Sequence, residues 1–278
     1  MPHTRSPVLL RPPVEVMQPV PVPVLPAEDA LPGGTQYTIK LDGIRATAHI
    51  LEGHEVRLVS RRGNELGDRF PQLPPALAVL PVGLVLDGEI VAYERTGAGP
   101  GRLDFTALLR SPRGRAAAGT QVLYVAWDAL ALPGRDIRDR PLRERWQALE
   151  MALTGARPPL QLCMATTSRT EAADWYRGLQ PLGIEGIVAK GLDTPYRPTH
   201  GASAWLVDCT NSLPMVWSSV RKAGLGPARR PARGDPPPPQ VGGDGQRRDT
   251  PPNSPNHDDR ILQLGNRPDL RRRQQRMR

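Results

Sequence analysis

The sequence predicts an α+β domain in which helices flank mainly antiparallel β-sheet. Runs typical of β-strands, one of which (residues 44–50) alternates apolar with polar residues, recur between residues 36 and 190. Helix-start signals separate several of these runs, and the two kinds of pattern together indicate one mixed domain. After residue 210 the apolar periodicity is lost, and proline and arginine dominate.

Six segments carry the strand pattern. The first three are residues 37–40, residues 44–50 and, after a turn around Gly53, residues 56–60. A fourth segment contains an Asp87-Gly88 step, which predicts a turn or a bulge inside a β-rich run. The full set of expected strands is 37–40, 44–50, 56–60, 84–91, 122–127 and one at the end of 182–190.

Three helices are expected between these strands. The first covers residues 104–109. The second follows Asp139 as its N-cap, has Pro141 in its first turn and continues through residue 149. The third begins at Ser168, where Glu171 has the spacing of a capping box. Since only 4% of the residues are aromatic, the core is expected to consist mainly of Leu, Val and Ala.

The chain divides into three expected parts. Residues 1–32 are rich in proline and valine, which favours an extended arm on the domain surface without helix. Residues 33–210 form the folded domain. Residues 211–278 are expected to be a disordered Pro/Arg-rich tail, because they cannot bury enough apolar surface to offset the entropy of ordering.

The charge and the few special residues limit the function classes. A net charge of +9 favours a polyanionic partner, although a basic tail alone also raises the charge. Only Lys40, Lys190 and Lys222 are lysines, and two of them lie in the motifs below, which indicates a need for an amine there. Cys163 and Cys209 lack CxxC spacing, so neither a zinc site nor a disulfide framework is expected. No run approaches the ~20 apolar residues of a membrane span, and a cytoplasmic monomer without a membrane partner is expected.

Lys40 is the first candidate for chemistry. It ends a predicted strand just before Gly43, whose missing side chain lets a ligand's phosphates approach the backbone. If cations flank the amine and burial removes water, its pKa falls and it can attack phosphorus. Asp42 is placed to orient the amine, and Arg45 to hold phosphate or ribose. Taken alone, so short a segment favours a solvated strand end with a Lys–Asp surface pair worth at most ~1 kcal/mol, because such a pattern arises often by chance.

The segment Lys40-x-Asp42-Gly43-x-Arg45 resembles the adenylation motif of ATP-dependent DNA ligases, and further elements follow in that family's order. They are residues 60–64 (SRRGN) with Phe70-Pro71, residues 86–91 (LDGEIV), 124–128 (YVAWD), 138–145 (RDRPLRER), 185–190 (EGIVAK) and Trp205-Leu206. The resemblance covers residues 14–206. It implies an ATP-grasp-like nucleotidyltransferase fold, with the DNA ligase adenylation domain at residues 33–210.

The resemblance also implies a reaction. Lys40 would attack the α-phosphate of ATP, expel pyrophosphate and hold AMP. The AMP would then pass to the 5′-phosphate of nicked double-stranded DNA, and the 3′-hydroxyl would displace it, in repair or recombination. A divalent cation is implied, and Glu89 and Glu185 are the candidate ligands because Mg²⁺ prefers oxygen.

Six residues are expected to bind the nucleotide on the strength of the same resemblance. Trp127 would stack on adenine, Arg61 would lie near sugar and phosphate, and Lys190 would contact phosphate; the full set is Thr38, Asp42, Arg45, Arg61, Trp127 and Lys190. Each candidate also has a plainer interpretation. Glu89 fits a solvated turn, Glu185 fits a strand entry, and Trp127 fits a core aromatic.

Three features depart from the family's pattern. Thr38 stands where members carry a glutamate that reads the adenine amine. The family's Trp-Leu-Lys-x-Lys is replaced by Trp205-Leu206-Val207-Asp208-Cys209, so both lysines are lost, and Asp208 is expected to add negative charge where phosphates bind. No five-strand OB-barrel pattern follows Trp217. One hypothesis is that the ligase homology, or the coding frame, ends near Leu206.

Two alternatives to an active DNA ligase therefore remain. One is a degenerate ligase core that only binds nucleotide or DNA. The other is a related covalent nucleotidyltransferase, such as an RNA ligase or capping enzyme, but residues 60–64 and 138–145 favour the DNA-ligase branch.

Overall fold

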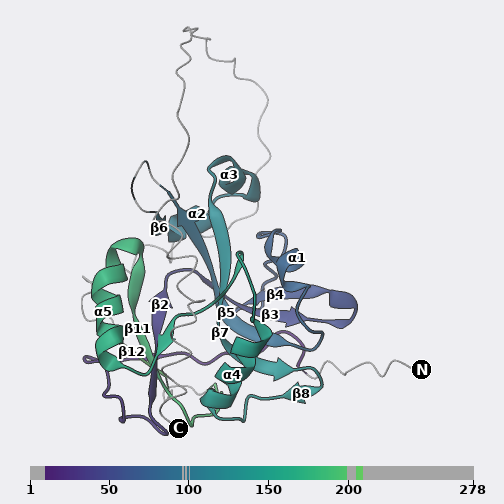
Figure 1. The fold of residues 1–278 in the computed structure, drawn as a ribbon. Coiled ribbons are helices and arrows are strands. Elements are labelled where there is room, and N and C mark those ends of the chain that lie inside the picture. The colour runs from purple at the N-terminus through teal and green to yellow at the C-terminus, as the bar shows by residue number, and fades with distance from the viewer. Residues whose placement is uncertain (1–9, 96, 98, 100, 199–204, 209–278) are drawn as a thin grey trace, which may run out of the picture. The chain divides into compact units, whose positions relative to one another are not determined.

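The described part of the chain forms two β-sheets with helices packed against them (Figure 1). The computed structural model describes residues 10–95, 97, 99, 101–198 and 205–208. The start of the predicted arm, Cys209 and the whole predicted tail lie outside these residues. Of the ten strand pairings that the described residues make, eight are antiparallel. The predicted α+β class is therefore confirmed.

The first sheet has five strands and carries Lys40. In spatial order they are β1 (Val20–Pro21), β12 (Trp205–Asp208), β11 (Ile184–Gly191), β2 (Thr35–Leu41) and β10 (Ala165–Thr166). The second sheet has seven strands: β4 (Val56–Ser60), β3 (Ile44–Ile50), β5 (Val85–Glu94), β7 (Gln121–Leu132) and β8 (Arg135–Asp136) in order, with β6 (Arg102–Leu103) on β5 and β9 (Leu160–Leu162) on β7.

All six predicted strands are confirmed, as β2, β3, β4, β5, β7 and β11. The strands that sequence periodicity missed, β1, β6, β8, β9, β10 and β12, have two to four residues each. So short a segment does not contain enough alternation to be recognised.

The Asp87-Gly88 step is a bulge and not a turn. Strand β5 runs through it without a break, and its pairing with β7 slips there, from Asp87 opposite Asp128 to Gly88 opposite Ala126. The extra residue is therefore Trp127, on the partner strand. A Cβ on Gly88 would lie 2.5 Å from the carbonyl oxygen of Val125, so only glycine allows the two strands to approach this closely.

The helices cover the sheets as the apolar pattern requires. They are α1 (Leu73–Leu77), α2 (Phe105–Leu108), α3 (Pro112–Ala117), α4 (Leu142–Ala152) and α5 (Arg169–Leu179), with 3-10 turns η1 (Glu52–His54) and η2 (Gln180–Leu182). Helices α1 and α4 close a core of Leu and Ala on one face of the seven-stranded sheet, while α5 packs on β11 and β2 (Figure 1). None of the helices in the described residues is long and apolar enough to cross a membrane.

One of the two predicted helix caps is confirmed and the other is not. Pro141, and not Asp139, occupies the N-cap position of α4, and it has no side-chain cap. Ser168 caps α5 as predicted by accepting from the amide of Glu171, but the reciprocal half of the capping box is absent. Instead, the Glu171 carboxylate accepts from the hydroxyl of Thr166 at 2.6 Å, and that hydroxyl accepts from the amide of Ser168. Helices α1 and α3 were not predicted, since each has only five or six residues.

The described residues of the arm contain no helix, as predicted, but residues 28–32 form turns. The expected position on the domain surface is wrong for Val14, Val16, Met17 and Leu25, which are buried. The arm residues are bound to the domain at several places along their length. Strand β1 pairs with β12, and the amide of Met17 donates to the hydroxyl of Tyr196 at 3.1 Å. Met17 is 2% exposed, so this part of the arm belongs to the core.

A buried ion pair joins α4 to the seven-stranded sheet. Arg145 donates from Nε and Nη2 to the two carboxylate oxygens of Asp128, at 2.9 and 3.1 Å, and both side chains are fully buried. Its Nη1 also donates to the carbonyl oxygen of Thr194 at 2.9 Å. This single side chain therefore connects the helix, β7 and the segment after β11.

Arg145→Met is expected to lower the free energy of unfolding by about 3–5 kcal/mol, because the Asp128 carboxylate would stay buried without its partner. Arg140→Met is the matched control. Arg140 pairs with Glu144 on the same helix surface, where both are nearly half exposed, and such a pair contributes about 0.5 kcal/mol or less. Urea unfolding of the three proteins measures both changes, and equal losses would contradict the central role of Arg145.

Candidate active site

Lys40 lies on one face of β2, and side chains of β2, β11 and β12 share this face of the sheet. Since side chains alternate along a strand, Gln36, Thr38 and Lys40 share this face. Across the sheet, Gly186, Val188 and Lys190 of β11 are their register partners. Trp205 and Val207 of β12 continue the row, opposite Lys190 and Val188. We call this set the Lys40 face.

The chain passes from one sheet to the other directly after Lys40. Strand β2 ends at Leu41, and β3 of the seven-stranded sheet begins at Ile44. Gly43 sits at the crossing, where a Cβ would lie 2.3 Å from the carbonyl oxygen of Ile90 and 2.7 Å from Cγ of Glu89. The structure thus gives a packing reason for glycine here, the closeness of β5, whereas the predicted approach of a ligand's phosphates stays a prediction.

The direct partner of Lys40 is Glu185. The ammonium donates to Oε2 of this carboxylate, and the side chains are 31% and 25% exposed. Glu185 is the extra residue of a bulge in β11, between Ile184 opposite Leu41 and Gly186 opposite Lys40. The bulge turns this carboxylate toward the lysine. The condition for a lowered pKa of Lys40, flanking cations, is therefore not met by this neighbour, which is an anion.

Glu89 supplies a second carboxylate close to Lys40. It is 8% exposed, and burial raises its pKa to about 8, which Arg45 partly opposes. The interpretation of Glu89 as a solvated turn carboxylate is therefore wrong. No cluster of three or more His, Cys, Asp or Glu side chains that could hold a metal is present among the described residues. Two acidic side chains beside Lys40 still fit Mg²⁺, which keeps several waters and takes other oxygens from phosphates.

Arg45 is held by a buried network. Its Nε and Nη2 donate to the carboxylate of Asp87 at 3.0 and 2.7 Å, Nη2 also reaches the hydroxyl of Tyr196 at 3.3 Å, and Nη1 donates to the carbonyl oxygen of Met17. Burial opposes the charge of Arg45, but Asp87 prevails and raises its pKa. These contacts occupy most of the guanidinium N–H groups. They favour a role in positioning the site over the direct phosphate contact that the motif predicts.

Trp127, Trp205 and two cations form one cluster beside this network. The Arg45 guanidinium lies 5.4 Å from the Trp127 ring centre and 5.7 Å from that of Trp205. The Lys190 ammonium lies 4.4 Å from the Trp205 ring centre and 3.4 Å from the carbonyl oxygen of Trp127. Burial lowers the pKa of Lys190 to about 8. Lys190 and Trp127, predicted as nucleotide ligands, are thus brought together.

The remaining predicted ligands lie at different depths. Thr38 is 2% exposed on the Lys40 face. Asp42 is half-buried at the crossing, and burial raises its pKa. Arg61 is exposed and donates to Oε1 of Gln18 at 2.7 Å, next to the segment of the arm that holds Arg45. The structure records no contact between Arg61 and Lys40.

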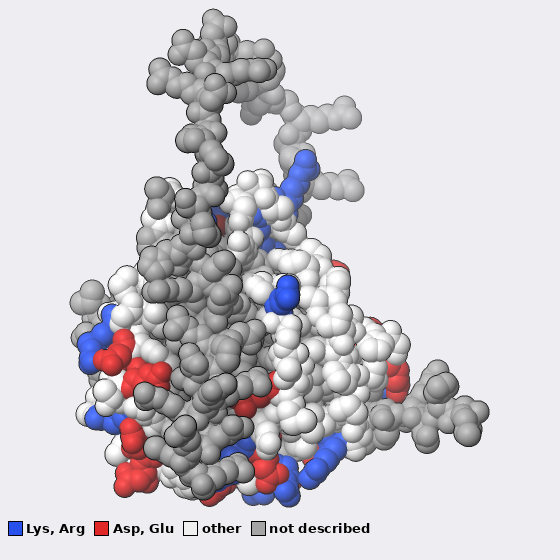
Figure 2. Space-filling model, viewed as in Figure 1, with Lys and Arg blue, Asp and Glu red and all other residues white. Residues whose placement is uncertain are grey.

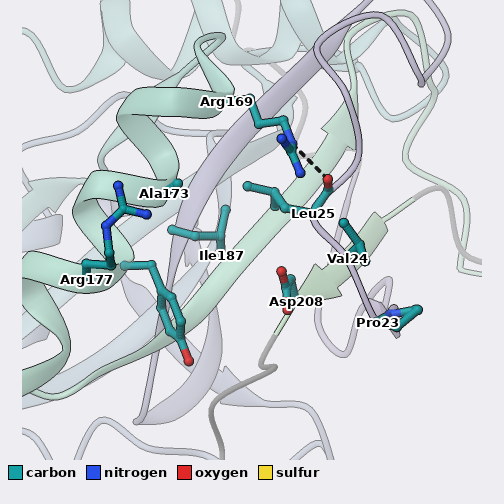
Figure 3. Close-up of a pocket in the computed structure, with 9 residues that line it drawn as sticks. Pro23, Val24, Leu25, Arg169, Ala173, Arg177, Ile187 and Asp208 are labelled. Carbon is teal, nitrogen blue, oxygen red and sulfur yellow. Dashed lines mark hydrogen bonds between the residues drawn. The ribbon is translucent and has the colours of Figure 1, made fainter.

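Asp208 does not lie where the sequence placed it. It is the register partner of Ile187, on the face of the sheet opposite to Lys40, whereas Val207 pairs with Val188 on the Lys40 face. Figure 3 shows the Asp208 carboxylate turned into a pocket that Ile187 lines together with Arg169 and Arg177 of α5. The expected negative charge at the phosphate site is therefore wrong. Val207 does stand on the site face in place of a cation, and Cys209 lies outside the described residues.

Two members of the site were not recognised from sequence. Asp87 is fully buried and accepts from Arg45, from the Trp127 indole at 3.1 Å and from the Tyr196 hydroxyl at 2.8 Å. Its alternation with Glu89 along β5 was a usable signal. For Tyr196 the available signal was its place in residues 193–196, directly after the motif at residues 185–190. On the face shown in Figure 2, the described basic and acidic side chains are mixed, without a single basic stripe.

Comparison with known proteins gives one consistent answer. A family model described as an ATP dependent DNA ligase domain matches residues 27–206. DNA ligase C2 of Mycolicibacterium smegmatis is 36% identical over 190 residues, which is 66% of this chain and 52% of that protein. The multifunctional non-homologous end joining protein LigD of Pseudomonas aeruginosa is 37% identical over 178 residues, 63% of this chain and 20% of that protein. The chain thus spans roughly half the length, or less, of these curated relatives.

Solved structures agree with the sequence relatives. The ligase domain of Mycobacterium tuberculosis LigD has a TM-score of 0.51 and 26% identity, covering 69% of this chain and 59% of that one. A mycobacterial DNA ligase D complexed with ATP and MES has a TM-score of 0.50 and 26% identity, covering 69% and 60%. The nucleotidyltransferase fold expected from the motifs is therefore confirmed.

Gly43→Ala is expected to destabilise the protein by about 1–3 kcal/mol or more, because the new methyl group meets backbone that has no room to move aside. Gly178→Ala in α5 is the control. Nothing lies within 4 Å of its Cβ position, and removing a helical glycine stabilises by up to about 1 kcal/mol. Denaturant unfolding of both variants checks the pair, and an unchanged Gly43→Ala protein would refute the close crossing.

Proposed function

This chain belongs to the ATP-dependent DNA ligase family, and we propose from that premise that it forms a covalent lysyl-AMP at Lys40. The AMP then passes to the 5′-phosphate of a nick in double-stranded DNA. The observation that carries the proposal is the position of Lys40. It is a partly exposed amine at a sheet crossing, hydrogen-bonded to Glu185 and with Glu89 beside it.

The chemistry of the first step fits these neighbours. The amine must lose its proton before it attacks, and the Glu185 carboxylate, which accepts a hydrogen bond from that amine, is the nearest group that could take it. A nitrogen–phosphorus bond forms at the α-phosphate as the bond to pyrophosphate breaks. Since positioning and charge neutralisation supply most of the acceleration in such transfers, the bulge that aims Glu185 at Lys40 contributes directly.

Glu89 and Glu185 are the proposed Mg²⁺ ligands. A bound Mg²⁺ would neutralise charge on the phosphates. Glu89 fits this task because burial disfavours its charged form, and a cation would restore it. The Cγ methylene of Glu89 lies against the Gly43 crossing, and Glu89 pairs with Arg45 across β3 and β5, so two strands position this side chain.

The other site residues are proposed to receive the nucleotide. Trp127 offers a ring, Lys190 a buried amine, and Thr38 and Asp42 polar groups next to Lys40. Arg45 orders this region through Asp87, and Arg61 lies at its exposed margin. ATP is the proposed substrate, and one solved relative is named as a complex with ATP.

The wider role is also a proposal. The basic composition suits a DNA partner, and one relative is named as a non-homologous end joining protein, which supports work in DNA repair or recombination. We propose a cytoplasmic monomer. Residues 1–32, 33–210 and 211–278 remain the proposed arm, adenylation domain and tail.

One observation favours the alternative of a ligase core with weak activity. Val207 occupies the Lys40 face at a position where the family carries lysine, and it is 5% exposed. An apolar side chain there removes a cation from the face that would meet phosphates. Asp208, which faces away, adds no further penalty.

Incubation with α-labelled ATP and Mg²⁺ is expected to give an acid-labile labelled protein. Lys40→Arg keeps the ion pair with Glu185 but supplies no attacking amine, so labelling should fall about 10³-fold or more while the melting temperature stays close to wild type. A wild-type protein that stays unlabelled beside an active control ligase would sink the enzyme proposal. A Lys40→Arg protein that still labels would sink the assignment of the nucleophile.

Two lysine substitutions, at neighbouring positions of β12, test whether the lack of a cation on the Lys40 face limits activity. Val207→Lys places an amine on the Lys40 face and is expected to raise the rate of adduct formation about tenfold or more. Asp208→Lys places the same amine on the opposite face, among Arg169 and Arg177, and should leave the rate unchanged. Single-turnover labelling, normalised to folded protein, measures both. Equal effects of the two variants would contradict the assigned faces of β12.

A further inference from the structure

The carboxamide of Gln36 is buried on the Lys40 face with an unpartnered oxygen. Gln36 is 5% exposed, and its Oε1 has no hydrogen-bond partner in the described structure. A buried polar atom left without a partner costs about 1–3 kcal/mol. Such an atom at a ligand site is explained most simply by a donor that the ligand brings.

The position of Gln36 relative to Lys40 limits what that donor can be. The two residues are four apart on one face of β2, about 13 Å along the strand at roughly 3.3 Å per residue. Gln36 is the register partner of Lys190, whose ammonium lies between the carbonyl oxygen of Trp127 and the ring of Trp205. The carboxamide is therefore at the aromatic end of the face, far from the phosphorus that Lys40 attacks.

An AMP unit bonded to Lys40 reaches this end with its base. The phosphate is fixed at the amine, the ribose follows, and adenine is the part farthest from the bond. A carboxamide matches adenine well, since its oxygen accepts from the exocyclic amine while its NH₂ group donates to a neighbouring ring nitrogen. Guanine presents a carbonyl oxygen at the position of that amine, which would meet Oε1 as a second acceptor.

We propose that Gln36 is the residue that selects adenine, by pairing its carboxamide with the 6-amino group of the base. This inference rests on the proposed function at Lys40 and adds the specificity determinant of the same site. Thr38, two residues nearer to Lys40, offers only a hydroxyl on a short side chain, so it cannot present an acceptor and a donor side by side.

The test compares ATP with purine riboside triphosphate, which lacks only the 6-amino group. Wild-type protein is expected to form the Lys40 adduct with a kcat/KM about 10- to 100-fold higher for ATP. Gln36→Leu, of similar size and without the amide, should reduce that ratio to about one by losing rate with ATP alone. Gln180→Leu, an exposed glutamine after α5, is the matched control and should keep the wild-type ratio.

Each remaining outcome has a defined meaning. If Gln36→Leu slows both nucleotides equally, Gln36 is only a structural residue and the proposal is overturned. If wild type forms no adduct with either nucleotide, the function proposed for Lys40 fails, and calorimetric titration of Lys40→Arg protein and of Lys40→Arg combined with Gln36→Leu decides Gln36 separately. A preference for binding ATP that Gln36→Leu removes supports the selection of adenine, whereas equal or absent binding refutes it.

Discussion

The close crossing at Gly43 is the constraint on which the site depends. The chain leaves the five-stranded sheet at Leu41 and enters the seven-stranded sheet at Ile44, with room only for a glycine against β5. This short passage fixes Lys40 at the end of one sheet and Arg45 at the start of the other. It also sets Glu89 beside them. A longer or bulkier connection would separate the Lys40 amine from the Glu89 carboxylate and from Arg45.

The buried carboxylate of Asp87 is the second feature that organises the site, because it both stabilises the fold and positions the site residues. Asp87 is fully buried and gathers Arg45, Trp127 and Tyr196, so it fixes β3, β7 and the loop after β11 around one carboxylate. Breaking such a pair is costly, because the remaining charge cannot reach water. The rigidity of this network gives Lys190 and Trp127 a fixed place. The network also occupies the Arg45 guanidinium with hydrogen bonds to protein groups, so this motif arginine need not contact the nucleotide.

The long strands could be predicted from sequence, because β3 alternates apolar with polar residues and β5 and β7 contain apolar runs of several residues. Lys40 as the nucleophile stays a prediction. The orientation of the side chains around Lys40 could not be predicted from sequence. Glu185 and Trp127 take their orientation from bulges, and a bulge is a property of two paired strands that one strand's pattern does not reveal. Asp208 was misplaced for a related reason, since a four-residue strand gives no face until its register with β11 is known. Tyr196 depends wholly on tertiary contact.

The central claim is that one amine among three lysines carries AMP. Peptide mapping by tandem mass spectrometry, after incubation of the wild-type protein with ATP and Mg²⁺, tests it most directly. The account predicts an AMP-modified peptide with the adduct on Lys40, and unmodified peptides for Lys190 and Lys222. An adduct on Lys190, which is buried beside the same aromatic cluster, would contradict the account, as would modification of Lys222 or of none of the three.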